Sequence, residues 1–156
     1  MLFSAGDKGW EMMVAACNNF CITREAGLLK ISFHSTMENI DRADQESRIF
    51  LKNNGLQSEI FSVCLCMREG LTNAVRHGHK NDPSKIVKYS LARTGNRLIM
   101  EIEDEGDGFD WKRVRKRKPA FESDHGRGLM IIQNYFSTYL FNEKGNKLTL
   151  EKVLPS

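Results

Sequence analysis

The chain has 156 residues, of which 40% are hydrophobic and 28% are charged, and its formal net charge is +3. This length suits one compact domain, and the composition argues against extensive disorder and against a strongly basic nucleic-acid-binding protein. No apolar run approaches the roughly 20 residues that cross a bilayer, and residues 12–17 lack the basic leader of a secretory signal. The sequence therefore predicts a cytoplasmic protein without a membrane segment.

Residues 1–27 are predicted to be an N-terminal extension, and residues 28–156 the folded domain. Within the extension, six residues fit one face of a short helix: Trp10, Met13, Val14, Cys17, Phe20 and Cys21. Such a helix would be either a packed extension or a contact in a homodimer.

The first elements of the domain are a strand and two helices. Leu29, Ile31 and Phe33 alternate with polar residues, as in a strand with one buried face. Ser35 and Glu38 have the spacing of a capping box and predict a helix that ends near residues 53–55. A second helix is predicted over residues 57–76, because apolar side chains recur there at intervals of three and four.

Two hairpins and a third helix complete the pattern. One hairpin pairs residues 86–92 with 97–104, the other pairs 139–141 with 147–153, and the helix spans 128–136. This order does not repeat strictly as strand, helix, strand. It favours a two-layer α/β sandwich with a mixed, largely antiparallel sheet and helices on one face.

The cysteines and the basic residues give little indication of a metal site, a disulfide or a nucleic-acid-binding surface. The pairs Cys17/Cys21 and Cys64/Cys66 do not have the spacing of a usual zinc site, and without a secretion signal we expect buried thiols and no disulfides. The basic run at 112–118 fits a solvated loop better than a nucleic-acid contact, because no aromatic residues are interleaved with it.

Three places in the sequence could carry chemistry, and the first is a helical pair. Glu69 and Asn73 lie four residues apart on the predicted second helix, so their side chains are neighbours. An amide oxygen can bind Mg²⁺, and a carboxylate can act as a general base. The alternative is an ordinary solvated helix face, with His77 as a plain helix-end residue.

The second place is the end of the strand at 97–104. Asp104 shares the predicted buried face with Met100 and Ile102, so its carboxylate needs a donor such as the adenine amine. Gly106 and Gly108 allow a backbone to approach a ligand closely. Alternatively, Asp104 only caps a backbone amide in a glycine-rich turn.

The third place is the start of the predicted helix at 128–136. Gly126 and Gly128 would expose amides and the positive end of the helix dipole to a phosphate. A simple helix-opening turn explains the same residues equally well. The co-occurrence of all three places in this order favours the functional interpretation.

The order of Glu69-x-x-x-Asn73, Asp104-x-Gly106-x-Gly108 and Gly126-x-Gly128 resembles the Bergerat-type ATP-binding domain shared by gyrase, histidine kinases and mismatch-repair ATPases. Residues 69–78 are most similar to the bacterial anti-sigma-factor serine kinases. The resemblance covers about residues 28–153.

The resemblance implies specific roles. Asn73 would bind Mg²⁺, Glu69 would be the catalytic base and Asp104 would contact adenine, while residues 111–125 would form a mobile lid. Further contacts to ATP would come from His77, Gly106, Gly108, Gly126, Arg127, Gly128 and Leu129. Where the family often has Gly-Thr, this chain has Gly145-Asn146, which leaves open how Asp104 is supported.

The function implied by the resemblance is that of a protein-serine kinase with ATP and Mg²⁺ as cofactors. It would phosphorylate a small anti-anti-sigma partner of the STAS type and bind a sigma factor or similar regulator. One alternative is a binding module that is controlled by nucleotide and transfers no phosphate. Another is the catalytic half of a histidine kinase, which is disfavoured because about 27 upstream residues cannot supply two long helices.

Overall fold

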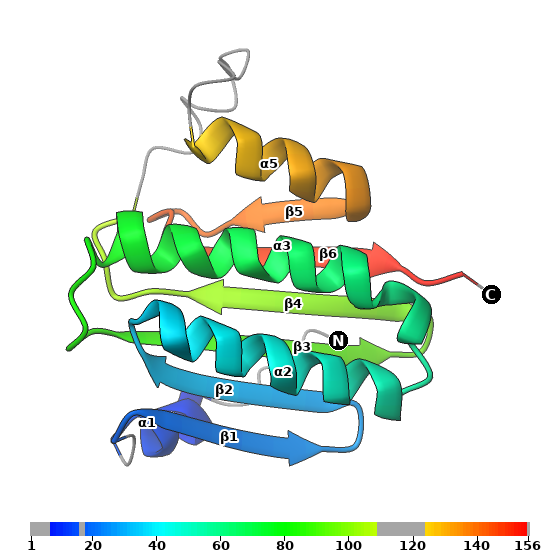
Figure 1. Ribbon diagram of the computed structural model, residues 1–156, viewed down its shortest axis with the longest axis horizontal. Coiled ribbons are helices and arrows are strands. Elements are labelled where there is room, and N and C mark those ends of the chain that lie inside the picture. Colours follow the sequence, from blue (N-terminus) through cyan, green and yellow to red (C-terminus); the bar gives the residue numbers. More distant parts are fainter. Residues whose placement is uncertain (1–6, 16–17, 109–123, 156) are drawn as a thin grey trace.

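A computed structural model describes residues 7–15, 18–108 and 124–155, which contain one six-stranded sheet (Figure 1). Its strand order is β1-β2-β3-β4-β6-β5, and every neighbouring pair is antiparallel. The strands are β1 (Phe20–Glu25), β2 (Leu28–His34), β3 (Ile86–Thr94), β4 (Arg97–Glu103), β5 (Thr138–Phe141) and β6 (Lys147–Val153). The predicted α/β fold class is confirmed, although the pairing among these strands is antiparallel throughout and not mixed.

Three helices lie against one face of this sheet (Figure 1). They are α2 (Met37–Asn53), α3 (Ile60–Asn73) and α5 (Asp124–Tyr135). A short 3₁₀ helix, η1 (Gln57–Glu59), precedes α3, and a π-helical segment, η2 (Ala74–Gly78), continues it. In Figure 1, α2 and α3 run side by side, and α5 lies beyond α3 and next to β5.

The core lies between the helices and the sheet because alternate strand residues point toward the helices. Ile31, Tyr89, Met100 and Leu150 come from four adjacent strands and are fully buried there. The helix α3 approaches β4 closely at Gly70, where any Cβ would collide with the Ile102 side chain. The absence of a side chain at Gly70 therefore allows α3 to lie close to β4.

The N-terminal extension is only partly helical. The helix α1 covers Asp7–Ala15 and includes Trp10 and Met13 as predicted, but Phe20 and Cys21 lie in the edge strand β1, paired with β2. The prediction of one helical face through residue 21 was therefore wrong. Lys30, on the side of β2 opposite Leu29 and Ile31, places its ammonium 5.2 Å from the Trp10 ring centre, so α1 covers the other face of the sheet.

Two helix starts also differ from the prediction. Thr36, not Ser35, caps α2, because its hydroxyl accepts a hydrogen bond from the Asn39 amide at 3.2 Å. The helix α5 begins at Asp124, four residues before the predicted start. Gly126 and Gly128 therefore lie inside its first turns.

The prediction of buried thiols is confirmed for Cys64 and Cys66 but not for Cys21, which is only partly buried, and Cys17 lies outside the described residues. Cys21, Cys64 and Cys66 are free thiols, and the last two are buried. Burial raises the pKa of Cys64 to about 11 and that of Cys66 to about 12. Among the helices of the described ranges, none has the length and apolar character required to span a membrane.

Candidate functional site

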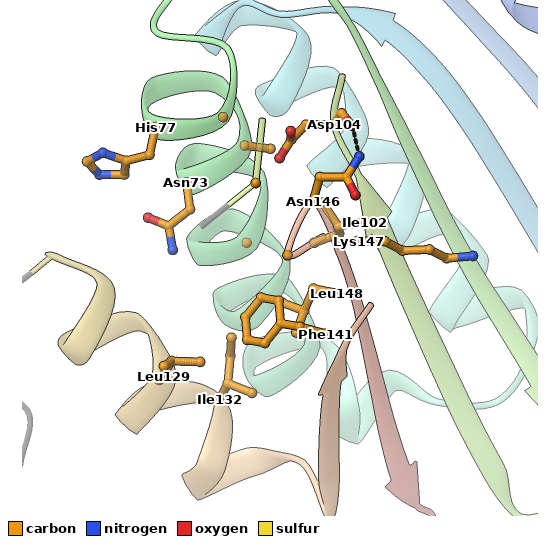
Figure 2. Close-up of a pocket in the computed structure, with 15 residues that line it drawn as sticks. Asn73, His77, Ile102, Asp104, Leu129, Ile132, Phe141, Asn146, Lys147 and Leu148 are labelled. Carbon is orange, nitrogen blue, oxygen red and sulfur yellow. Dashed lines mark hydrogen bonds between the residues drawn. The ribbon is translucent and has the colours of Figure 1, made fainter. Parts of the chain in front are cut away.

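A cavity of about 290 Å³ opens between α3, α5, the end of β4 and the turn that joins β5 to β6 (Figure 2). Its apolar lining is formed by Ile102, Leu129, Ile132, Phe141 and Leu148, and its polar lining includes Asn73, His77, Asp104 and Asn146. This volume is near the lower end of the range of small-molecule pockets, about 300–1,000 Å³. An apolar slot with a few polar groups suits a flat, partly polar ligand.

The helices α3 and α5 bring the first and third sequence motifs together. A Cβ placed on Gly128 would lie 3.2 Å from Asn73 Nδ2 and 3.4 Å from Glu69 Oε2. The start of α5 therefore packs directly on the pair Glu69 and Asn73. Asn73 lines the cavity, whereas Glu69 lies one turn earlier on α3, outside the lining.

The π-helical segment η2 widens the turn that follows Asn73. The His79 amide donates to the Ala74 carbonyl oxygen at 2.8 Å, a bond that spans five residues where an α-helix spans four. This turn carries Gly78 against Asp104, where a Cβ would lie 2.5 Å from the carboxyl carbon. Only glycine fits at Gly78 while Asp104 keeps this position.

Asp104 directly follows β4 and is held by hydrogen bonds of its backbone and of one carboxylate oxygen. Its amide donates to the Asn146 carbonyl oxygen at 2.9 Å, and its own carbonyl oxygen accepts from Asn146 Nδ2 at 2.8 Å (Figure 2). Oδ1 accepts from the Gly106 amide at 2.8 Å. Asp104 does cap a backbone amide, but among the residues that the structure describes Oδ2 has no donor and is left for a ligand.

The pKa of Asp104 is raised from its ordinary value of 3.8 to about 6. The main cause is burial, which disfavours the charged form, and the negative charges of Glu103 and Glu105 add to it. The Gly106 amide and Lys144 act in the opposite direction. A partly desolvated carboxylate at a cavity wall is a group that gains from a ligand donor.

The turn between β5 and β6 supports Asp104 from the other side. Asn142 Oδ1 accepts from the amides of Gly145, Asn146 and Lys147 at 2.8, 3.0 and 3.1 Å, which fixes the turn. Gly108 has a φ of +79°, and a Cβ there would collide with the Lys144 carbonyl oxygen. The hydrogen bonds from Asn146 therefore support the backbone of Asp104.

The remaining predicted residues are placed as follows. Leu129 lines the cavity. His77 is exposed at the rim of the cavity, on the same side of the helix as Asn73 (Figure 2). Gly106 packs against the Gly78 carbonyl group. Gly126 and Arg127 belong to the first turn of α5, but their side-chain surroundings lie outside the described residues. The basic run at 112–118 and the lid as far as residue 123 also lie outside them.

Sequence reasoning assigned no role to Gly70, Gly78 or Asn142. Glycines inside a helical pattern and an asparagine in a turn have ordinary local explanations, so no local signal could have identified these contacts. The two glycines act through residues distant in the sequence, Gly70 through Ile102 and Gly78 through Asp104. These contacts can be identified only from the three-dimensional structure.

The residues present fit an adenine nucleotide. The cavity offers apolar walls, glycines that allow close approach and an Asp104 carboxylate oxygen that accepts no hydrogen bond from the described residues. No group of three or more His, Cys, Asp or Glu side chains within the described ranges could hold a metal ion. A magnesium ion here would thus need phosphate and water oxygens as ligands in addition to the Asn73 amide oxygen. Mg²⁺ in nucleotide sites is usually coordinated in this way.

Comparison with known proteins agrees with this geometry. The sequence profile of the histidine kinase-like ATPase domain matches residues 33–152. The anti-sigma F factor of Anoxybacillus flavithermus is 28% identical over 101 residues, 62% of this chain and 68% of that protein. The anti-sigma F factor of Geobacillus stearothermophilus is 30% identical over 58% of this chain and 65% of its own length. That of Clostridium kluyveri is 26% identical over 82% of this chain and 95% of its own length.

Proposed function

Because the chain belongs to the histidine kinase-like ATPase domain family, with similarity to anti-sigma F factors, we propose that it binds Mg-ATP in the cavity and phosphorylates a serine of a partner protein. The observation that carries the proposal is the packing of Gly128 on Glu69 and Asn73. This contact puts a candidate base and a candidate metal ligand next to the start of a helix, where phosphates bind favourably.

Each side chain has a role in this proposal. Asp104 receives the adenine amine through Oδ2, and the apolar wall covers the faces of the base. Asn73 offers its side-chain oxygen to Mg²⁺, which when bound supplies positive charge to the phosphates. His77, at the cavity rim, and the residues from Gly126 to Leu129 contact the phosphates and the sugar.

Glu69 is the proposed general base. It accepts the proton of the partner's serine hydroxyl while the serine oxygen bonds to the γ-phosphorus of ATP. The bond from that phosphorus to the bridging oxygen breaks, and ADP leaves with the electron pair. Positioning supplies most of the acceleration in such a transfer.

The names of the relatives support a proposal about the partners. We propose that the phosphorylated protein is a small anti-anti-sigma protein of the STAS type and that the chain also binds a sigma factor or similar regulator, because its relatives are named anti-sigma F factors. An ATP-dependent activity of this kind would take place in the cytoplasm. We also propose that residues 1–27 could form a contact in a homodimer.

The test is Glu69→Gln, assayed with labelled ATP, Mg²⁺ and candidate partner proteins. ATP affinity should stay within about threefold of wild type, while phosphate transfer falls about a hundredfold or more, the usual contribution of a general base. Glu101→Gln is the matched control, because Glu101 lies on the other face of β4 and pairs with Lys147 at 3.2 Å. It should transfer phosphate like wild type.

Two results would change the assignment. If Glu69→Gln labels the partner as fast as wild type does, Glu69 is not the base. If wild type binds ATP but labels no candidate partner, the chain is a nucleotide-controlled binding module.

A further inference from the structure

His79 is a buried histidine with no role in the function proposed above. It directly follows the π-helical segment η2 and is only 4% exposed. Its Nδ1 lies 2.9 Å from the hydroxyl of Ser35, which sits between β2 and α2, and its Nε2 lies 2.7 Å from the backbone nitrogen of Glu105. The imidazole thus joins the end of η2, the start of α2 and the loop that follows β4.

The hydrogen bonds define the protonation state of this ring. A backbone N–H can only donate, so Nε2 of His79 must accept from the Glu105 amide. The proton of the neutral ring is then on Nδ1, which donates to Ser35 Oγ. His79 keeps its link to Glu105 only while it is neutral.

The amide of Glu105 belongs to the peptide unit that also contains the Asp104 carbonyl group. That carbonyl oxygen accepts from Asn146 Nδ2 at 2.8 Å, while the N–H of the same peptide donates to His79. Both polar atoms of one peptide plane are therefore fixed by side chains, one at each edge of the plane. The next amide, from Gly106, holds Oδ1 of Asp104, so the direction of the carboxylate depends on this plane.

Burial has a larger effect on the pKa of His79 than the charges around it. Burial lowers its pKa below the usual 6.5, and Lys85 lowers it further. The carboxylates of Glu105 and Asp82 act in the opposite direction, and Ser35 on the third side is uncharged. The ring is therefore neutral at pH 7 and able to accept.

We propose that His79 is a positioning residue for base recognition: it holds the Asp104–Glu105 peptide so that Asp104 faces the adenine amine. This inference rests on the nucleotide-binding function proposed above. Loss of the acceptor at Nε2 leaves the part-buried Glu105 amide without its partner in the protein and lets the peptide rotate. Affinity for ATP then falls more than affinity for a nucleotide that lacks the 6-amino group.

The experiment compares His79→Phe with His79→Gln. Phenylalanine keeps the ring but has no acceptor, whereas a glutamine oxygen can reach the position of Nε2 and does not titrate. Binding of ATP and of inosine triphosphate, which has an oxygen in place of the amine, is measured by calorimetry at pH 7.5. We expect His79→Phe to reduce the preference for ATP about tenfold and His79→Gln to stay within threefold of wild type.

A nucleotide-free measurement separates this inference from the proposed function. In the Asp104→Asn variant, which removes the titration of Asp104 near pH 6, the NMR shift of the Glu105 amide should change with pH at the same midpoint as the His79 ring. A Glu105 amide that does not follow His79 overturns the inference, even where His79→Phe fails to fold. An unchanged ATP preference in folded His79→Phe, or an equal loss in His79→Gln, also overturns it. Failure of wild type to bind any adenine nucleotide overturns the proposed function and, with it, the role of His79 in base recognition.

Discussion

Replacing Asp104 by asparagine should weaken nucleotide binding and stabilise the nucleotide-free protein. Both effects have one cause, the burial of a carboxylate that raises its pKa from 3.8 to about 6. Asparagine keeps the size of the side chain and can still accept from the Gly106 amide through Oδ1. It removes the charge that the fold disfavours and that the adenine amine would pair with.

The sign of the stability effect follows from proton binding. Between about pH 4 and pH 6 the folded state holds a proton on Asp104 that the unfolded state has released. The free energy of unfolding of wild type therefore decreases as pH rises through this window, and Asp104→Asn removes that decrease. At pH 7.5 the variant should be more stable than wild type, and below about pH 4 the two should be equal.

The magnitude is modest. The full shift would correspond to about 3 kcal/mol at roughly 1.4 kcal/mol per pKa unit, but solvent reaches part of this carboxylate, so about 1 kcal/mol is the better expectation. In a domain of this size that raises Tm by about 2–4 °C. Loss of a hydrogen bond to a charged group, about 1.5–3 kcal/mol, should weaken ATP binding about tenfold to a hundredfold.

The assay is thermal unfolding without nucleotide at several pH values between 4 and 8, together with ATP calorimetry at pH 7.5. Asp107→Asn is the control, because Asp107 is exposed and does not line the cavity. A variant no more stable than wild type at pH 7.5 would refute the buried-charge reasoning. Unchanged ATP affinity would remove Asp104 from the site.

Three further changes test the surroundings of the cavity. Gly78→Ala should lower ATP affinity more than tenfold, because its Cβ displaces the Asp104 carboxylate, and calorimetry checks this beside a Tm measurement that excludes unfolding. Asn146→Ala frees the Asp104 carbonyl oxygen and should weaken ATP binding about threefold to tenfold; unchanged affinity would mean that this bond is dispensable. Asn73→Ala should reduce the gain in ATP affinity on adding Mg²⁺, which titrations with magnesium and with a chelator would show, and an identical gain in both proteins would contradict its role as a ligand.

The strands and helices with clear periodicity could be predicted from the sequence. Alternation placed β2, β3, β4 and β6 correctly, and the three- and four-residue spacing placed α3. The edge strand β1 was missed because its apolar residues also fit a helix, and only pairing with β2 decides between the two. The sequence could not show this because strand pairing is a long-range interaction.

The sequence predicted residues that line the candidate site, but it did not predict the contacts between helices and strands that shape the site. Asn73, Asp104 and Leu129 do line one cavity. The start of α5 was placed too late because glycines disfavour a helix interior. At Gly128, an added Cβ would lie only 3.2 Å from Asn73 Nδ2 on α3, and no local rule contains that contact.

The segment from Ile60 to Gly78, α3 with η2, carries both ends of the cavity. Asn73 faces α5 at one end, and Gly78 contacts Asp104 at the other. An added Cβ at Gly70 would meet the tip of the Ile102 side chain, so α3 lies close to β4 within the same segment. In the proposed function, the residue that would bind the metal ion and the residue that packs against the base-recognising carboxylate therefore belong to one continuous helical segment.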